Sequence, residues 1–265
     1  MDLQNMPIMR KTFIILALLC SALTAASAQS KYEPKVFESS AGEKLNYQLL
    51  KPADAEKGKK YPLVIFLHGM GERGDDNKTQ MKHGSQMFLN PANQEKYPAY
   101  VLFPQCPETA FWAYKRPTLN MKAEDVMPPI FQAVKELIDS YLAQPDIDKQ
   151  RVYIMGLSMG GMATFDMVAR FPEIFAAAVP ICGAVDPSRL AATKGVKFRI
   201  FHGDADRVVP VISSRMAYRA LREAGVDVEY IEFPGCDHAS WNPAFNTPDF
   251  MEWLFKQKKS KKYMK

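Results

Sequence analysis

Short and almost uninterrupted apolar runs recur along the chain between residues 61 and 233. They are Tyr61–His68, Ala99–Phe103, Arg151–Met155, Ala176–Ile181, Lys197–His202 and Val228–Phe233. Strands that are buried on both faces produce such runs, whereas strands with one solvated face alternate between apolar and polar residues. The runs therefore predict the strands of a parallel sheet. Two earlier segments, Lys35–Ser39 and Lys44–Leu50, are expected to form an antiparallel pair at its start.

Helical periodicity fills the intervals between these runs. From Ala123 to Leu142 apolar residues recur at three- and four-residue spacing, and helices are also predicted over Met159–Arg170, Ser213–Glu223 and Asp249–Lys256. Strands that alternate with helices are typical of an α/β fold, a mostly parallel sheet with helices on both faces. No break in composition divides residues 29–255, which we interpret as one catalytic domain.

The amino terminus has the pattern of a secretory signal. Arg10 and Lys11 precede a short apolar run, and residues 26–28 are Ala-Ser-Ala. This order predicts a signal peptide over residues 1–28, cleavage near Ala28, and a periplasmic or secreted protein. A buried amino-terminal helix is the alternative. The apolar run is shorter than the roughly 20 residues of a membrane span, so no stable membrane insertion is expected.

The net charge of +5 is concentrated at the two ends of the chain. Residues 256–265 contain six lysines and no acid, residues 1–28 carry +1, and residues 29–255 therefore carry −2. A nucleic-acid partner is not expected, because phosphate binding needs a basic face on the folded domain. The lysine-rich tail is expected to be solvated.

Cysteine and histidine usage gives no sign of a metal site. Removal of the signal peptide would leave Cys106, Cys182 and Cys236, which allow at most one internal disulfide. The spacing of these cysteines and of the four histidines matches no zinc motif. Neither a metal nor an organic cofactor is expected.

A candidate nucleophile follows the third of the apolar runs. Residues 156–160 are Gly-Leu-Ser-Met-Gly, directly after Arg151–Met155 and at the start of a predicted helix. In sheets of this kind ligands bind at the carboxyl ends of the strands. A G-x-S-x-G turn between strand and helix presents its serine there as a nucleophile. Ser158 is therefore the predicted nucleophile, and an ordinary turn with a capping serine is the alternative.

The loop after the first run is the candidate oxyanion loop. Residues 68–71 are His-Gly-Met-Gly, and a glycine-rich loop lets backbone N–H groups point into a site. Acyl transfer needs such donors for its tetrahedral intermediate. The candidates are the backbone N–H groups of Met70 and of Met159. His68 is expected to hold the loop.

An acid and a base follow the last two runs. Hydrolases with the G-x-S-x-G turn order their triad as Ser, Asp, His along the chain. His238 is the only histidine beyond the candidate acids, so it is the predicted base. Asp206 is the predicted acid, and Asp204 and Asp186 are its competitors. Asp237 adjoins the base too closely to reach the far ring nitrogen.

These motifs together resemble one branch of a known family. Residues 67–74, Leu-His-Gly-Met-Gly-Glu-Arg-Gly, are similar to the LHGxGERG signature of secreted esterases and predicted peptidases of the α/β-hydrolase fold. That branch is related to dienelactone hydrolases and phospholipase/carboxylesterases. Further similar segments are Pro104–Pro107, Gly156–Gly161, Val179–Gly183, His202–Asp206 and His238–Trp241. The resemblance runs from about Tyr61 to Leu254 and departs at Cys236-Asp237, where relatives usually carry glycine before the histidine.

The resemblance implies a serine carboxylesterase without a cofactor. Ser158 would attack the acyl carbonyl, His238 would transfer the proton, and Asp206 would orient His238. The implied substrates are short-chain, acetyl or feruloyl esters, either small molecules or esters attached to plant polysaccharides. The alternatives are a prolyl-oligopeptidase-like peptidase and a lysophospholipase or thioesterase. A non-enzymatic binding protein is a further alternative, under which the order of these motifs along the chain would be a coincidence.

The substrate site is expected to be open and partly aromatic. Only Gly183–Val196 separates two predicted strands where related folds often carry a lid, so no cap domain is expected. Trp112, with Phe111 and Tyr114 beside it, and Trp241 are candidate substrate-binding residues for a phenolic acid or a sugar. Core packing is the alternative for these rings.

Overall fold

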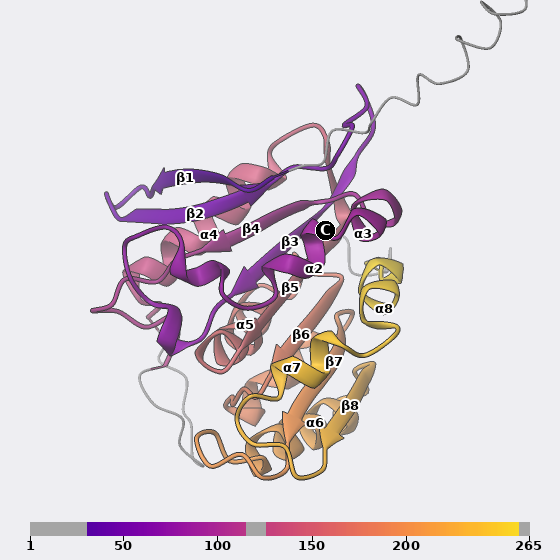
Figure 1. Cartoon of the computed structure of the whole chain (residues 1–265). Coiled ribbons are helices and arrows are strands. Elements are labelled where there is room, and N and C mark those ends of the chain that lie inside the picture. The colour runs from indigo at the N-terminus through magenta and orange to yellow at the C-terminus, as the bar shows by residue number, and fades with distance from the viewer. Residues whose placement is uncertain (1–30, 115–125, 260–265) are drawn as a thin grey trace, which may run out of the picture.

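The computed structural model describes residues 31–114 and 126–259, which build one eight-stranded sheet with helices on both faces (Figure 1). The predicted signal peptide and residues 260–265 of the lysine-rich tail lie outside the described residues. The strands are β1 (Glu33–Glu38), β2 (Lys44–Leu50), β3 (Tyr61–Leu67), β4 (Tyr100–Pro104), β5 (Ile147–Leu157), β6 (Ala177–Ile181), β7 (Lys197–Gly203) and β8 (Val228–Phe233).

The sheet has the order β1-β2-β4-β3-β5-β6-β7-β8. β1 pairs with β2 and β2 pairs with β4 in antiparallel fashion, and every later pair is parallel. The predicted parallel sheet and its antiparallel start are therefore confirmed. All residues of β3, β4 and β6 are buried, which is the physical reason for their continuous apolar sequence.

The helices are α2 (Ser85–Leu89), α3 (Pro91–Lys96), α4 (Pro129–Leu142), α5 (Met159–Arg170), α6 (Ile212–Glu223), α7 (Trp241–Phe245) and α8 (Phe250–Lys256). Three 3₁₀ turns, η2 (Met70–Glu72), η3 (Thr79–Met81) and η4 (Pro187–Thr193), lie in the loops. The bounds of α5, α6 and α8 lie within one residue of those predicted from helical periodicity. Residues 123–125 of the helix predicted over Ala123–Leu142 lie outside the described residues, and within them α4 begins at Pro129. A proline suits the first helical position because it has no N–H to leave unpaired.

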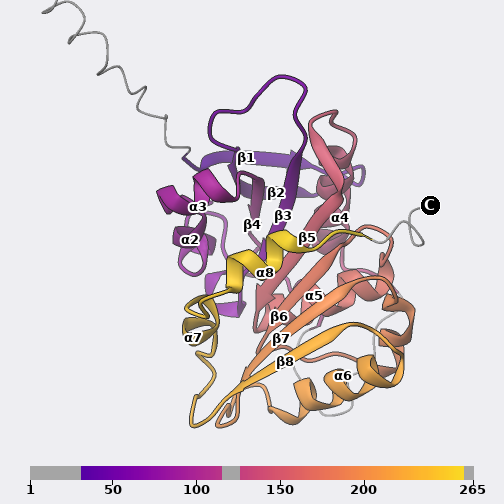
Figure 2. The same cartoon turned by 90° about the vertical axis from the view of Figure 1, so that its right-hand side faces the viewer.

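The two faces of the sheet carry two separate hydrophobic clusters. Leu63 and Ile65 of β3 pack with residues of α4, α5 and α6 on one face. Val64 and Phe66, which alternate with them, pack with residues of α2, α7 and α8 on the other (Figures 1 and 2). Period-two alternation along a strand produces this division. The sheet is thus a rigid platform whose parallel strands end together at one edge.

The described part of the chain has no cap over this edge of the sheet, as predicted for the substrate site. Gly183–Val196, between β6 and β7, holds only the short turn η4, and no cap domain occurs within residues 31–114 and 126–259. No helix of these two segments combines the length and apolar character that a membrane crossing requires.

Candidate active site

Ser158 occupies a strained turn between β5 and α5. Its backbone has φ 54° and ψ −117°, a conformation that residues other than glycine rarely adopt. Its N–H donates to the carbonyl of Ile181 on the neighbouring strand at 2.9 Å, which helps to hold the turn. A Cβ on Gly156 would lie 2.5 Å from the carbonyl oxygen of Gly160, and one on Gly160 would lie 1.9 Å from that of Leu67. Glycine is therefore required at both positions of the G-x-S-x-G turn.

Three side chains that are far apart in sequence meet at this turn. The hydroxyl oxygen of Ser158 lies 2.9 Å from Nε2 of His238, and Nδ1 of His238 lies 2.7 Å from Oδ2 of Asp206. Since Asp206 accepts at Nδ1, the hydrogen of a neutral imidazole lies there, and Nε2 is free to accept the serine proton. The geometry brings together the three residues that the sequence predicts as nucleophile, base and acid.

The competing acids have other contacts. Asp204 accepts from the backbone N–H of Gly235 at 2.6 Å and joins the loops after β7 and β8. Asp186 accepts from the N–H of Ser188 at 3.0 Å at the start of η4. Both carboxylates therefore stabilise loops in this structure.

Asp206 is held as a carboxylate by several donors. Burial acts to raise its pKa, but hydrogen bonds from His202 and His238 and from the backbone N–H groups of Val209 and Val208 outweigh burial. The pKa of Asp206 therefore lies well below its usual range. The two backbone donors lie 2.8 Å and 2.9 Å from Oδ1, which leaves Oδ2 for the histidines.

The sequence analysis missed the second histidine on this carboxylate. Nε2 of His202 lies 3.1 Å from Oδ2 of Asp206 and 2.9 Å from the carbonyl oxygen of Val209. Because both of these atoms accept, Nε2 carries a hydrogen, and Nδ1 can accept from the hydroxyl of Ser214 at 2.7 Å. His202 is fully buried and is the second-to-last residue of β7. The only sequence signal was its position four residues before the acid.

Two backbone N–H groups face the same edge of the sheet. Met70 begins η2 after β3, and Met159 begins α5, where the helix dipole adds partial positive charge. Within the described residues neither N–H donates to an acceptor. Both amides follow the carboxyl ends of neighbouring strands, β3 and β5, and their role as oxyanion donors stays a prediction.

His68 supports the loop that carries Met70. Its Nδ1 donates to the carbonyl oxygen of Gly69 at 2.6 Å, and its Nε2 accepts from the backbone N–H of Cys106 at 2.9 Å. Burial lowers the pKa of His68 to about 4, and the nearby Arg73 acts in the same direction, while the bond to Gly69 opposes them. A neutral imidazole with both nitrogens occupied agrees with a structural role.

The prediction that Trp112 binds substrate is not supported by its placement. The side chain is fully buried, its Nε1 donates to the carbonyl oxygen of His68 at 3.2 Å, and its ring lies 5.2 Å from the His68 ring. The ring therefore has no surface to offer a ligand and belongs to the core beneath the oxyanion loop. Its neighbours have structural contacts as well, since Phe111 stacks on Arg73 and Tyr114 donates to Asp166.

Replacement of Trp112 by alanine is therefore expected to destabilise the fold by about 3–5 kcal/mol, the usual cost of removing a buried aromatic ring. Urea unfolding followed by circular dichroism measures this loss, with Trp241→Ala as the partly exposed comparison. A Trp112→Ala protein of native stability with a higher KM only for aromatic esters would restore the substrate-binding role.

Trp241 lies beside the base. Its ring meets the His238 ring edge-on, with centroids 5.5 Å apart, and on another side it lies 5.1 Å from the ring of His83. The side chain is half-buried, so part of the ring is open to solvent. Trp241 therefore remains a candidate for contact with a substrate.

The cysteines of the described residues are free thiols. One of them, Cys182, lies under the triad, and its Sγ and the ligand atoms of Asp206 and His238 all lie within 4.8 Å of one another. Burial raises the pKa of the Cys182 thiol far above its usual value, so this group is a protonated neighbour of the triad. The carboxylate and imidazole of the same group are already bonded to each other.

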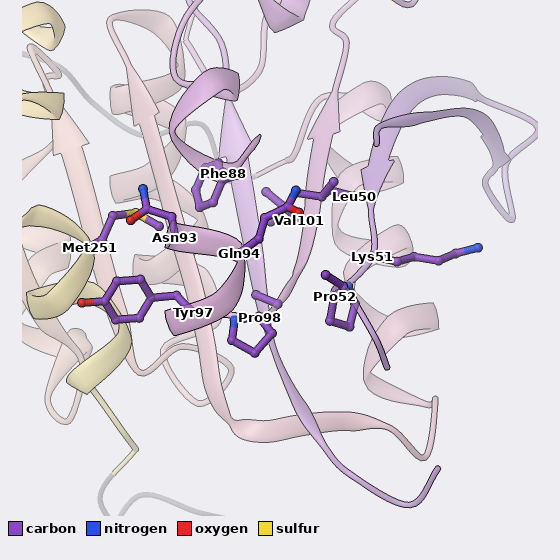
Figure 3. Close-up of a pocket in the computed structure, with 12 residues that line it drawn as sticks. Leu50, Lys51, Pro52, Phe88, Asn93, Gln94, Tyr97, Pro98, Val101 and Met251 are labelled. Atoms are coloured by element: carbon purple, nitrogen blue, oxygen red, sulfur yellow. The ribbon is translucent and has the colours of Figure 1, made fainter. Parts of the chain in front are cut away.

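A small pocket lies at the opposite edge of the sheet. Figure 3 shows its lining, which includes Phe88, Gln94, Tyr97 and Met251 from the helical side and Pro98 before β4. These residues surround the amino end of β4, whereas Ser158 follows the carboxyl end of β5. The pocket is therefore one strand length away from the triad.

Comparisons with known proteins agree with the architecture. A family model described as phospholipase/carboxylesterase matches residues 53–250. The chain is 27% identical over 200 residues to carboxylesterase SOBER1 of Arabidopsis thaliana, covering 68% of this chain and 84% of that protein. It is 25% identical over 181 residues to poly(3-hydroxyalkanoate) depolymerase C of Paucimonas lemoignei, covering 66% of this chain but only 40% of that protein.

A solved structure of a thermostable esterase superposes with a TM-score of 0.79 at 38% identity. The match covers 86% of this chain and 63% of the esterase chain. The chain thus spans less than two thirds of the length of that esterase and of the depolymerase.

Proposed function

The chain belongs to the phospholipase/carboxylesterase family, and on that premise we propose that it is a serine hydrolase that cleaves carboxylic esters through an acyl-enzyme. The observation that carries the proposal is the hydrogen-bonded row from Ser158 through His238 to Asp206. The free amides of Met70 and Met159 at the same edge support it. The esterase likeness at 38% identity supports ester substrates rather than amides.

The proposed reaction begins with attack of the Ser158 oxygen on the ester carbonyl carbon. Nε2 of His238 takes the hydroxyl proton, and Asp206 stabilises the imidazolium through Nδ1. The amides of Met70 and Met159 donate to the oxygen that gains negative charge. When the intermediate collapses, the ester C–O bond breaks and His238 gives its proton to the leaving alcohol. Water then repeats the steps on the acyl-enzyme and releases the acid and Ser158.

We propose short-chain esters, including acetyl and feruloyl esters on plant polysaccharides, as the substrate class. The short turn η4 leaves the described site without an enclosing cap, which favours bulky or polymer-attached esters over long acyl chains. The half-exposed ring of Trp241 offers a face for a sugar or phenolic ring. The signal-like amino terminus supports export to the periplasm or beyond.

An ester panel tests the proposal. Acetyl-xylan, methyl ferulate, p-nitrophenyl acetate and a lysophospholipid are offered to the protein and to its Ser158→Ala variant, with a peptide amide as the comparison for peptidase action. We expect Ser158-dependent release of acid from the short esters. Peptide hydrolysis without ester hydrolysis would contradict the proposal.

Turnover is expected to need no lipid interface. Because no cap closes the described site, the rate on a soluble short-chain ester should rise hyperbolically with concentration and show no jump when micelles form. The measurement is initial rate against tributyrin concentration across its solubility limit. A surge on emulsified long-chain triglyceride would show that the enzyme is a lipase with a lid.

A further inference from the structure

Glu72 is an almost buried carboxylate beside the proposed oxyanion loop. It is the last residue of η2, only 7% of its side chain is exposed, and within the described residues no donor bonds to its carboxylate. Its Oε2 lies 3.0 Å from the position that a Cβ on Gly69 would take, so the carboxylate lies against the loop. The carboxylate oxygens therefore keep open acceptor positions beside the loop, which hydroxyl donors of a ligand can fill.

Two further polar side chains continue from Glu72 towards the base. Nε2 of His83 lies 3.6 Å from Oε1 of Glu72, beyond hydrogen-bond distance, and the His83 ring lies against Trp241. The Nε1 atom of Trp241 is buried and has no hydrogen-bond partner among the residues that the structure describes. Burial lowers the pKa of His83, and the positive charge of Lys82 lowers it further while Glu72 opposes them, so the imidazole is neutral near pH 7.

The three side chains form a row that ends on the His238 ring. Trp241 contacts the His238 ring edge-on, and Glu72 lies two residues from the Met70 amide. In the proposed reaction His238 gives its proton to the leaving alcohol, so the surface beside this ring is where the alcohol lies. Unused polar atoms therefore line the leaving-group side of the triad.

We propose that Glu72, His83 and Trp241 form a leaving-group subsite for a hydroxyl-bearing alcohol, namely a sugar residue. This inference rests on the proposed esterase function and narrows its substrate class. Sugar hydroxyls donate to the Glu72 carboxylate and exchange hydrogen bonds with His83. The exposed part of the indole ring packs on the C–H face of the sugar.

Charge around the row favours a neutral alcohol over a cationic one. Lys82 acts on His83 from one side, and Arg73, whose guanidinium bonds the carbonyl oxygen of Met70, follows Glu72 directly. The positive charge of Lys82 at His83 and that of Arg73 at the Met70 loop oppose binding of an ammonium group. An ester of choline serves as the cationic comparison.

The test is the ratio of kcat/KM for 6-O-acetylglucose to kcat/KM for ethyl acetate. We expect wild-type protein to favour the sugar ester, and Glu72→Gln and His83→Phe each to lower the ratio about tenfold, the loss expected for a hydrogen bond to a polar or charged group. A ratio cancels any general damage to the oxyanion loop. Glu95→Gln on α3 is the matched control, because this exposed carboxylate lies in the helix before the amino end of β4 and should leave the ratio unchanged.

Three other results would overturn either the leaving-group subsite or the proposed esterase function. An unchanged ratio in both variants, or a wild-type protein with no preference for the sugar ester, overturns the subsite while leaving the esterase intact. A preference for acetylcholine that Glu72→Gln removes overturns it in favour of charge recognition. Failure of the proposed function is distinct, since neither acetyl ester would then be hydrolysed in a Ser158-dependent way.

Discussion

Ser158→Ala, His238→Ala and the double variant are all expected to lose similar activity, on the order of 10⁴–10⁶-fold in kcat. Ser158 and His238 share one hydrogen bond of 2.9 Å, and each is useless for proton transfer without the other. The losses should therefore not add in the double variant. Steady-state hydrolysis of p-nitrophenyl acetate measures all three, with thermal unfolding curves to confirm that each variant is folded.

Ser188→Ala is the matched control for the serine variant. Ser188 is exposed in η4, and its hydroxyl bonds only to Asp186 in the described structure, so near-native kcat is expected. A His238→Ala protein with near-native turnover would remove His238 as the base. Losses that multiply in the double variant would show that the two residues act separately.

Asp206→Asn is expected to lower kcat by about 10⁴-fold, and Asp204→Asn by far less. An amide at position 206 can present its NH₂ to His238 and favour the imidazole tautomer with hydrogen on Nε2, which cannot accept from Ser158. Asp204 instead bonds the N–H of Gly235, so its replacement should mainly loosen a loop. The measurement is kcat at saturating ester, together with the melting temperature of each variant.

The pH profile gives a second check on Asp206. Because its pKa lies well below the usual range, the Asp206 carboxylate is ionised at mildly acidic and neutral pH. Protonation of Asp206 should therefore not contribute to the fall of kcat/KM on the acid side. A larger loss in Asp204→Asn than in Asp206→Asn would move the acid to Asp204, and a large loss only in Asp186→Asn would move it after β6.

Much of the fold follows from local sequence pattern. β2 and β8 have the predicted bounds, and α5 has the predicted bounds as well, because continuous apolar runs and three-to-four spacing are strong local signals. The short helices α2, α3 and α7 were not predicted, since five or six residues hold too few turns to show a period. β5 extends past its apolar run at both ends: Ile147 pairs with β3 beyond a register irregularity, and Gly156 and Leu157 pair with β6.

The site was predictable where chain order constrained it. The G-x-S-x-G turn between a strand and a helix identified Ser158. His238 was identified because no other histidine follows the candidate acids Asp204 and Asp206 in the chain. The choice between Asp206 and Asp204 needed more, because both follow β7 and only the loop conformation shows that Asp206 faces the base. The core placement of Trp112 depends on its bond to His68, which is 44 residues away in the chain and leaves no local signal.

The most direct test of the central claim is to trap the acyl-enzyme. The protein is mixed with p-nitrophenyl acetate, quenched in acid within the first turnover, digested and analysed by mass spectrometry. The proposed mechanism predicts one acetyl group per chain, located on the peptide that contains Ser158 and absent from Ser158→Ala. Full ester turnover with no acetylated Ser158, or with the acetyl group on another residue, would contradict it.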